Sequence, residues 1–384
     1  MFGKIFLIAF LLLISADIYI FAIFIRKLTK NTILRILWFL PSMFLLAGIY
    51  FFFLSGSKYD GREIFSIVYI AITLPKIIFT IISLFDFPLR FLFKWKIYPF
   101  TILGLMAALC MEYIIIYGST VGKTKFEVNE IEFVSASVPD SFDGYKIVQI
   151  SDLHIGNWGG NKKVIKNLVG IINKLHPDAI MVTGDLVHNR ADELDGFEGI
   201  LSEMKAKDGI FSVLGNHDYG PYYRWENKEK EIQNLRDLKQ RQSNLGWTLL
   251  NNQHVFLVRD TDSIALIGVE NDGAPPFPQY GDLRGAMKGT ESTNFKLLLS
   301  HDPTHWRREV LDTDIDLMLA GHTHGTQFAL GRLSFASLVY PEWSGMYEYD
   351  GQSLYVNVGI GHVGIPFRFG AWPEITLITL KKEK

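Results

Sequence analysis

Long apolar segments dominate the first third of the chain. The four segments are 5–25, 36–54, 64–85 and 99–119. Each is long enough to cross about 30 Å of hydrocarbon as a helix. A cleavable signal peptide is the alternative for the first segment, but its apolar run is too long, no small-residue cleavage site follows, and three more such segments come after it. The pattern therefore predicts a transmembrane region over 1–120 with four helices.

From about residue 145 the pattern changes to short, β-branched apolar runs, which are typical of buried strands. These runs are 145–151, 179–185, 210–216, 264–270, 295–301, 317–322, 354–359 and 375–380. Apolar residues at helical spacing predict a helix over 162–175, and 231–240 favours another. The pattern indicates an α/β domain over 143–384, preceded by a linker and first strand over 121–142.

Lysine and arginine are unevenly distributed among the loops between the apolar segments, and such a bias sets membrane orientation. The first loop holds Arg26, Lys27, Lys30 and Arg35, the second Lys58 and Arg62, and the third Arg90, Lys94 and Lys96. Loops one and three are therefore expected to be cytoplasmic. This places the N-terminus and the α/β domain on the outer side, although the margin is a few charges and a mixed topology stays open.

Charge and cysteine usage narrow the function classes. The chain has a net charge of −2, and its first third holds an excess of lysine and arginine, so the remainder is acidic. Nucleic-acid-binding domains usually show the opposite sign, so no nucleic-acid partner is expected. The only cysteine, Cys110, lies in the fourth apolar segment, which leaves the compartment of the α/β domain open.

Three ionisable residues, Asp17, Lys76 and Glu112, fall inside the apolar segments. An ionisable group in a membrane is costly and usually pairs with another or lines a cavity. We favour a structural pair of Lys76 with either Asp17 or Glu112. A transporter with an appended domain is the functional alternative, although no internal symmetry supports it.

Polar side chains cluster where the predicted strands end. They are Asp152, His154, Asp185, Asn216, His217, Asp218, His301, Asp302, His322 and His324. In open α/β sheets, sites form at the carboxyl ends of strands. A mixture of carboxylate, imidazole and amide oxygen suits Mn, Fe or Zn. These ligands are too many for one ion, so we expect two ions that share one carboxylate.

The motifs DLH, GDLV, GNHD, LSHDP and GHTHG, in that order, resemble the signature of the calcineurin-like metallophosphoesterases. The resemblance covers 143–382. The glycine-rich tail with its final Pro-Glu strand is similar to the ending of bacterial membrane-tethered members, whose relatives include phosphodiesterases and lipid-A-pathway pyrophosphatases. The resemblance implies a four-layer α/β/β/α sandwich with two mixed sheets between helices.

The resemblance also implies roles for particular residues. One metal would be held by Asp152, His154, Asp185 and His324, and the other by Asp185, Asn216, His301 and His322, with Asp185 as the bridge. His217 resembles the family's non-ligand histidine, which stabilises the transition state or protonates the leaving oxygen, and Asp218 would hold its imidazole in orientation.

Other residues carry weaker signals. His188 and Asn189 follow the bridging aspartate closely and could reach substrate. Arg368 could bind phosphate oxygens, but a salt bridge to Glu374 explains it equally well. Many relatives have a second glycine where this chain has Thr326, which leaves the width of the pocket open.

Three loops rich in aromatics, 218–225, 274–281 and 340–349, are expected to surround the site. Tyrosine and tryptophan there could dip into the membrane interface, although ordinary loop packing is the favoured interpretation. A lipid is therefore one candidate substrate.

The hypothesis from the sequence is a membrane-anchored two-metal phosphoesterase. It would hydrolyse a phosphodiester, phosphomonoester or pyrophosphate bond by attack of a metal-bridging hydroxide. Its location would be a bacterial inner or plasma membrane, with the catalytic domain extracytoplasmic. The alternative is a catalytically silent sensor or scaffold that binds a phosphorylated ligand. Oligomeric state stays open.

Overall fold

The computed structural model describes residues 2–54, 61–94 and 97–383. The chain forms two compact units, Met1–Val121 with Gly364–Phe367, and Gly122–Val363 with Arg368–Lys384. Lys58 and Lys96, which contribute to the predicted membrane orientation, lie outside the described residues.

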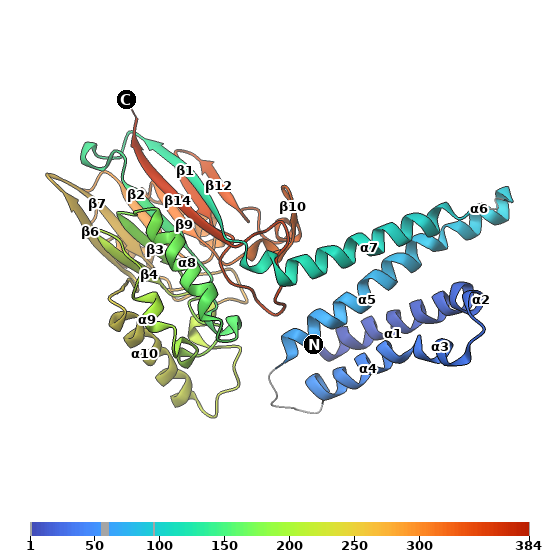
Figure 1. Ribbon diagram of the computed structural model, residues 1–384. Coiled ribbons are helices and arrows are strands. Elements are labelled where there is room, and N and C mark those ends of the chain that lie inside the picture. The colour runs from blue at the N-terminus through green and yellow to red at the C-terminus, as the bar shows by residue number, and fades with distance from the viewer. Residues whose placement is uncertain (1, 55–60, 95–96, 384) are drawn as a thin grey trace. The chain divides into compact units, whose positions relative to one another are not determined.

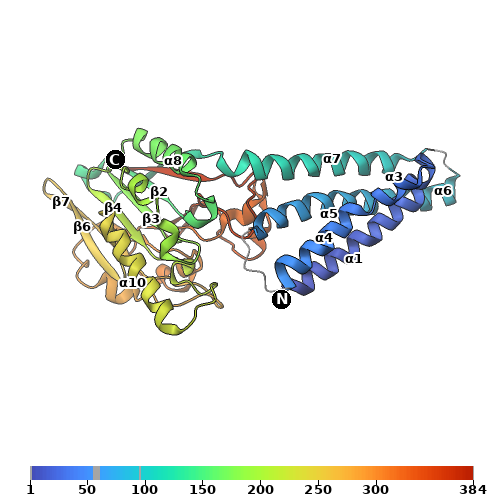
Figure 2. The same cartoon turned by 60° about the horizontal axis from the view of Figure 1, so that its bottom comes forward.

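The first unit is helical. Its elements are α1 (Phe2–Ile20), continued by a π-helical turn (Phe21–Ile25) and α2 (Arg26–Leu28), then α3 (Thr32–Leu37), α4 (Leu40–Ile49) with a second π-helical turn (Tyr50–Leu54), α5 (Arg62–Leu84), α6 (Asp86–Phe93) and α7 (Pro99–Thr120). Figures 1 and 2 both show α5 and α7 side by side. The Asn31 side chain accepts hydrogen bonds from the amides of Ile33 and Leu34, which explains why α3 begins there.

Within the described residues, three helical stretches are long and apolar enough to cross a membrane: Thr32–Phe52, Arg62–Phe93 and Pro99–Thr124. They coincide with the second, third and fourth apolar segments. The first segment is helical as well, but its role as a fourth membrane span stays a prediction.

A buried ion pair joins two helices of this unit. Lys76 Nζ of α5 lies 2.8 Å from Asp17 Oδ1 of α1, and Asp17 is fully buried. The Ser42 hydroxyl donates to the other Asp17 oxygen, and the Lys76 ammonium lies over the Trp38 ring. This pair is one of the two predicted for Lys76, and it satisfies both charges without a substrate.

Replacing Lys76 by methionine tests this pair. The change leaves the Asp17 carboxylate buried without its cation, so we expect the helical unit to lose about 3 kcal/mol of stability. The double variant Asp17→Asn, Lys76→Met should recover part of that loss. Denaturant titration of the purified protein in detergent measures both, and equal stability of wild type and the Lys76 variant would contradict this role.

The second unit contains two mixed six-stranded sheets and a two-stranded hairpin, β10 (Ala329–Leu330) with β11 (Leu333–Ser334). The first sheet has the order β1 (Glu127–Ser135), β14 (Glu374–Lys382), β2 (Lys146–Ile150), β3 (Ala179–Thr183), β4 (Gly209–Val213) and β5 (Thr248–Leu249). The second has the order β12 (Gly345–Tyr349), β13 (Gln352–Val356), β9 (Leu317–Ala320), β8 (Lys296–Leu299), β7 (Asp262–Gly268) and β6 (Gln253–Arg259). The strands β2, β3 and β4 are parallel, as are β7, β8, β9 and β13.

Successive side chains along each strand point to opposite faces of the sheet, and this alternation separates the core between the two sheets from the outer cores under the helices. On β3, Ala179 and Met181 face the core between the two sheets, whereas Ile180 and Val182 face the outer core under α8 (Lys162–Lys174), α9 (Glu198–Leu201) and α10 (Lys228–Asn244). On β8, Leu298 faces the opposite outer core, which contains residues of α11 (Leu283–Met287) and α12 (Thr304–Arg308). The four-layer α/β/β/α sandwich is therefore confirmed, and so are the predicted strands and both predicted helices.

Candidate metal centre

The carboxyl ends of strands from both sheets bring the predicted ligands together. Asp152 and His154 follow β2, Asp185 follows β3, and Asn216 follows β4. From the other sheet, His301 follows β8, and His322 and His324 follow β9. Side chains that are up to 172 positions apart in the sequence thus meet at one edge of the sandwich.

The first group of ligand atoms comes from Asp152, His154, Asp185 and His324. His154 Nε2 lies 3.1 Å from His324 Nε2 and 3.5 Å from Asp185 Oδ2, and His324 Nε2 lies 3.2 Å from Asp152 Oδ1. All four side chains are buried. This is the geometry of several ligands that point at one centre.

The second group shares Asp185 with the first. Asp185 Oδ2 lies 3.3 Å from His301 Nε2, which is itself 3.2 Å from Asn216 Oδ1 and 3.2 Å from His322 Nδ1. Since the same carboxylate oxygen faces His154 in one group and His301 in the other, Asp185 is placed to bridge two centres.

The residues present fit two divalent ions. Asp152 Oδ1 is buried, and the group beside it is another candidate ligand, His324 Nε2 at 3.2 Å. Burial lowers the pKa of His154 well below its usual value, and His217 and His324 add to this, so the ring is neutral, as a ligand must be. Burial would lower the pKa of His301 too, but Asp185 and Asp152 outweigh it and raise that pKa to about 10, which shows how strongly the carboxylates favour a cation. Mixed nitrogen and oxygen ligands suit Mn, Fe or Zn.

The backbone at the site is strained. Asp152, His154, Asp185, His322 and His324 have φ angles of 52°, 42°, 52°, 72° and 50°, a region that non-glycine residues rarely adopt. Backbone hydrogen bonds hold these turns, for example from the Asp152 amide to the Gly184 carbonyl at 3.0 Å. Gly184 has a φ of 91°, and a Cβ there would lie 2.6 Å from His301 Nδ1, so only glycine fits. Strain gathered at one place is common at functional sites.

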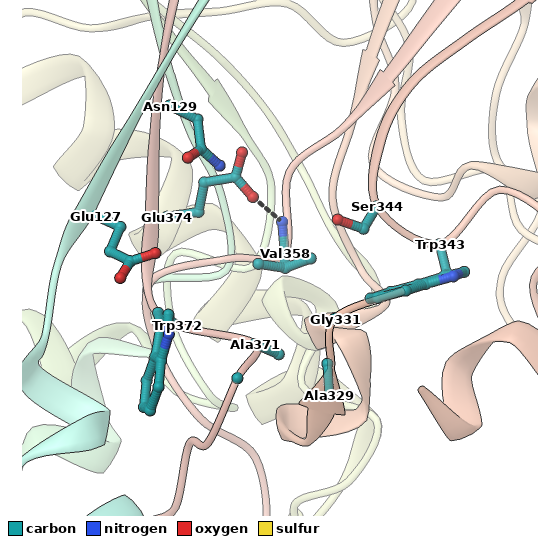
Figure 3. A pocket seen from close by; sticks show the side chains of 11 residues that line it. Glu127, Asn129, Ala329, Gly331, Trp343, Ser344, Val358, Ala371, Trp372 and Glu374 are labelled. Atoms are coloured by element: carbon teal, nitrogen blue, oxygen red, sulfur yellow. Dashed lines mark hydrogen bonds between the residues drawn. The ribbon is translucent and has the colours of Figure 1, made fainter. Parts of the chain in front are cut away.

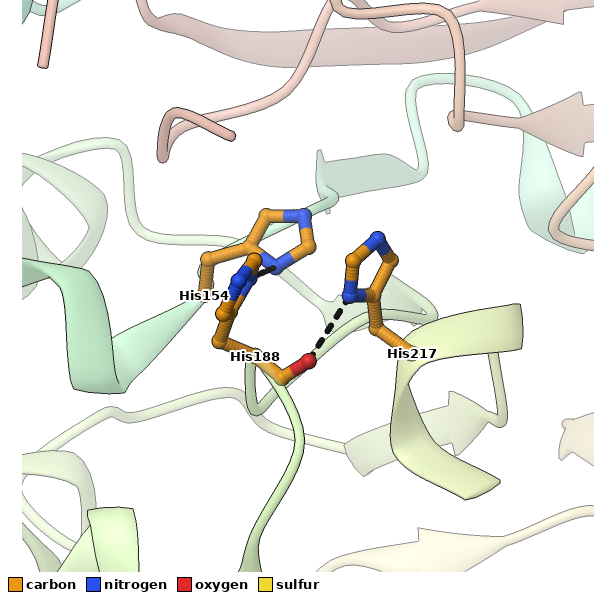
Figure 4. Close-up of side chains that lie close together, drawn as sticks. All are labelled: His154, His188 and His217. Carbon is orange, nitrogen blue, oxygen red and sulfur yellow. Dashed lines mark hydrogen bonds between the residues drawn. The ribbon is translucent and has the colours of Figure 1, made fainter. Parts of the chain in front are cut away.

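His217 lies beside the first group without belonging to it. Its Nδ1 lies 2.7 Å from the His188 carbonyl oxygen, and because a carbonyl only accepts, Nδ1 donates (Figure 4). Within the part of the chain that the structure describes, Nε2 has no hydrogen-bond partner. The His217 ring lies 4.7 Å from that of His154 and stacks on that of His188 at 4.8 Å. The other ring nitrogen, Nε2, is therefore not used in holding the ring in place.

The expected contact between Asp218 and the His217 imidazole is not met. Asp218 accepts from the amides of Gly215 at 2.9 Å and Val187 at 3.1 Å, so it ties together the loops after β3 and β4. A short carboxylate directly after the histidine reaches the backbone more readily than the ring, and the His188 carbonyl orients the imidazole instead.

His188 and Asn189 have different surroundings. His188 Nδ1 lies 3.4 Å from His154 Nδ1 and 3.3 Å from Asn157 Nδ2, so it contacts the ring of a candidate ligand on the side away from the other candidate ligands. The amide of Asn189 donates to Glu193 and its carbonyl accepts from Asn234. The structure thus brings His188 to the metal centre, whereas these Asn189 contacts lie within its own loop and toward α10.

Arg368 fits neither prediction made for it. Its guanidinium is fully buried and donates to the carbonyls of Gly361 at 2.7 Å and Val358 at 2.8 Å, and one of its nitrogens lies 2.9 Å from His324 Nδ1. Glu374 is occupied elsewhere, since it accepts from the Tyr355 hydroxyl and the Val358 amide. Figure 3 shows the hydrogen bond between the Glu374 carboxylate and the Val358 amide. Both residues line a cavity of about 110 Å³, and none of the predicted metal ligands lines it. Arg368 therefore orients His324 rather than holding phosphate.

The variant Arg368→Lys tests that role. Lysine cannot reproduce the forked donors, so His324 loses its support, and we expect metal affinity to fall about 10- to 100-fold, as for other residues behind metal ligands. Competition with a fluorescent chelator measures the affinity. Wild-type affinity in a folded Arg368→Lys protein would contradict this assignment.

Aromatic residues from the three predicted loops surround the centre. The Tyr222 hydroxyl accepts from Asn216 Nδ2 at 3.0 Å, which turns the amide oxygen of Asn216 toward His301. The ring of Phe277 lies 4.5 Å from that of His322, and the Tyr340 hydroxyl lies 3.0 Å from His322 Nε2. The prediction that these loops border the site is confirmed.

Two residues around His322 were placed near the site by the sequence but were given no role there. Asp302 Oδ2 is buried and lies 3.5 Å from His322 Nε2, and Tyr340 contacts the same nitrogen. The position of Asp302 directly after His301 was the available signal. For Tyr340 the signal was its aromatic loop 340–349, but the contact with His322 in particular was not predicted.

Thr326 does not narrow the centre. It adopts a φ of 49°, which is rare for a β-branched residue, and its exposed hydroxyl contacts the Gly325 carbonyl at 2.8 Å and Ser334 Oγ at 3.0 Å. The side chain is directed toward the hairpin of β10 and β11.

Fold and site together define a metal-dependent hydrolase with a helical membrane region. Residues 145–326 match the calcineurin-like phosphoesterase family, and 3–123 match the family described as a probable calcineurin-like phosphoesterase transmembrane domain. The chain belongs to the calcineurin-like phosphoesterases.

Known relatives agree with this assignment. The chain is 30% identical over 287 residues to a transmembrane protein with metallophosphoesterase domain from Danio rerio, which covers 72% of this chain and 62% of that protein. It is also 30% identical over 263 residues to the uncharacterized metallophosphoesterase YkuE of Bacillus subtilis, which covers 66% of this chain and 85% of the relative. The chain thus spans less than two thirds of the Danio rerio protein.

Proposed function

We propose that this chain hydrolyses a P–O bond of a phosphodiester, phosphomonoester or pyrophosphate, with a lipid as one candidate substrate. The observation that carries the proposal is the position of Asp185 Oδ2, within 3.5 Å of His154 Nε2 and 3.3 Å of His301 Nε2. One carboxylate between two histidine groups is the arrangement that a bridged pair of ions requires.

The candidate residues would divide into metal ligands and one proton donor. Asp152, His154, Asp185 and His324 would hold one ion, and Asp185, Asn216, His301 and His322 the other. Bound divalent ions would supply an activated water and neutralise charge on the phosphoryl oxygens. His217 would give its proton from Nε2 to the leaving oxygen, while the His188 carbonyl fixes its ring.

A substrate panel tests this function. Purified full-length protein with Mn²⁺ or Zn²⁺ is offered a model diester, a model monoester, a pyrophosphate and extracted membrane lipids, and released phosphate or alcohol is measured. We expect turnover of at least one class and none by Asp185→Ala. Silence on every class with both ions bound would favour the sensor that only binds a phosphorylated ligand.

We also propose that the chain lies in a bacterial inner or plasma membrane with its catalytic unit outside the cytoplasm. The support is the lysine and arginine excess of the first and third loops. In intact spheroplasts, added protease should remove the catalytic unit. Cleavage only after the membrane is opened would show that the catalytic unit lies on the cytoplasmic side.

A further inference from the structure

The segment 330–339 carries an unusual concentration of exposed apolar side chains. It comprises the β10–β11 hairpin and the following turn of 3₁₀ helix (Phe335–Leu338). The exposed fractions are 55% for Leu330, 76% for Leu333, 66% for Phe335, 80% for Leu338 and 68% for Val339. We call this segment the apolar hairpin. Elsewhere in the same unit such residues occur singly or in pairs, for example Val134 alone and Phe256 with Val258.

Exposure of this kind is costly in water unless something covers it. Contiguous apolar surface on a protein usually marks an interaction site, whereas single exposed residues need no explanation. The apolar hairpin contains no acidic residue, and its one charged side chain is Arg332. Apolar residues with a cation and without carboxylates suit the surface of a lipid bilayer.

The chain itself tethers the catalytic unit to a bilayer. The membrane-spanning helix α7 ends at Thr120 and β1 begins at Glu127. A fully extended connection over 121–126 reaches about 20 Å. The catalytic unit is therefore held at a membrane surface by its own sequence, which makes lipid a constantly available partner.

The base of the apolar hairpin is attached to the metal-binding loop. Ser334 Oγ donates to the Gly325 carbonyl at 2.7 Å and contacts Thr326 Oγ1 at 3.0 Å. At the other end, the hydroxyl of Tyr340 lies 3.0 Å from His322 Nε2. Thr326 adopts its rare backbone conformation at this contact. A surface that contacts the apolar hairpin therefore lies next to the metal centre.

We propose that the apolar hairpin inserts into the headgroup region of the bilayer and docks the catalytic unit on it. Leu333, Phe335 and Leu338 enter the apolar boundary, and Arg332 stays at the level of the lipid phosphates. Docking would bring phosphate groups at the membrane surface within reach of the metal centre. That consequence rests on the proposed hydrolase function, whereas the docking itself does not.

Fluorescent labels in proteoliposomes test the docking without any activity measurement. In the full-length Cys110→Ser protein, Val339→Cys and Val258→Cys are each labelled with an environment-sensitive dye. Both valines are 68% exposed, which makes Val258 a matched control. Leu338→Cys provides a second hairpin position, and gel filtration with bound-metal content confirms that each variant is folded.

We expect spin-labelled lipids to quench the labels at 338 and 339 at least twofold more than the label at 258, and iodide in the water to show the reverse order. Equal iodide quenching at all three positions would overturn the proposal. Hairpin labels protected from iodide yet unaffected by spin-labelled lipid would also overturn it, because a second protein copy would then cover the segment.

Discussion

Asp185→Asn should abolish hydrolysis and remove at least one ion. The change preserves shape but takes away the charge that faces both histidine groups, His154 on one side and His301 on the other. Neither ion then keeps its shared ligand, and the transition state loses the stabilisation that a bridged pair supplies. We expect kcat/KM to fall more than about 1,000-fold, which corresponds to about 4 kcal/mol.

Asp178→Asn is the matched control. Asp178 is also a buried aspartate, 4% exposed, but its partners are Lys207, Arg259 and the Lys146 amide. Its variant should lose stability and keep both ions and full turnover per folded molecule. Elemental analysis and phosphate release measure the two variants together, and Asp185→Asn protein with two ions and wild-type turnover would refute the bridge.

His217→Asn should slow the reaction without releasing the ions. The asparagine amide can still donate to the His188 carbonyl, as Nδ1 does at 2.7 Å, but nothing replaces Nε2. A general acid contributes about 10²- to 10⁴-fold, so kcat should fall by that factor for an alkyl ester with a poor leaving group.

Esters with different leaving groups distinguish proton donation by His217 from its other possible roles. A nitrophenolate leaves without a proton, so the same variant should lose much less activity on a nitrophenyl ester. An equal loss on both esters would exclude proton donation by His217 and leave charge stabilisation of the transition state as its role. Loss of metal from the variant would contradict its placement outside the ligand set.

The local pattern of apolar and polar residues was sufficient to predict most elements of the fold. Each short apolar run, such as 179–185 and 317–322, became a buried strand, because full burial on both faces requires uninterrupted apolar residues. The candidate ligands were located for the same reason. A polar residue directly after such a strand must lie at the sheet edge, as Asp185 and His322 do.

Contacts made through the fold were not visible in the sequence. Arg368 contacts His324 from 44 positions away, and Tyr340 reaches His322 through a loop. Asp218 bonds two amides rather than its neighbouring ring, a choice that depends on loop geometry. The exposed apolar surface of the hairpin was not predicted either. A short apolar run such as 333–339 is typical of a buried segment, and only the structure shows that its side chains are exposed.

The central claim is that two ions bridged by Asp185 carry out hydrolysis, and a metal titration tests it most directly. Metal-stripped full-length protein is titrated with Mn²⁺ while ester hydrolysis and the electron paramagnetic resonance spectrum are followed. The account predicts that turnover rises with the second bound ion, together with the spectrum of a magnetically coupled pair. Full turnover with one bound ion, or two bound ions with no hydrolysis of any ester, would contradict it.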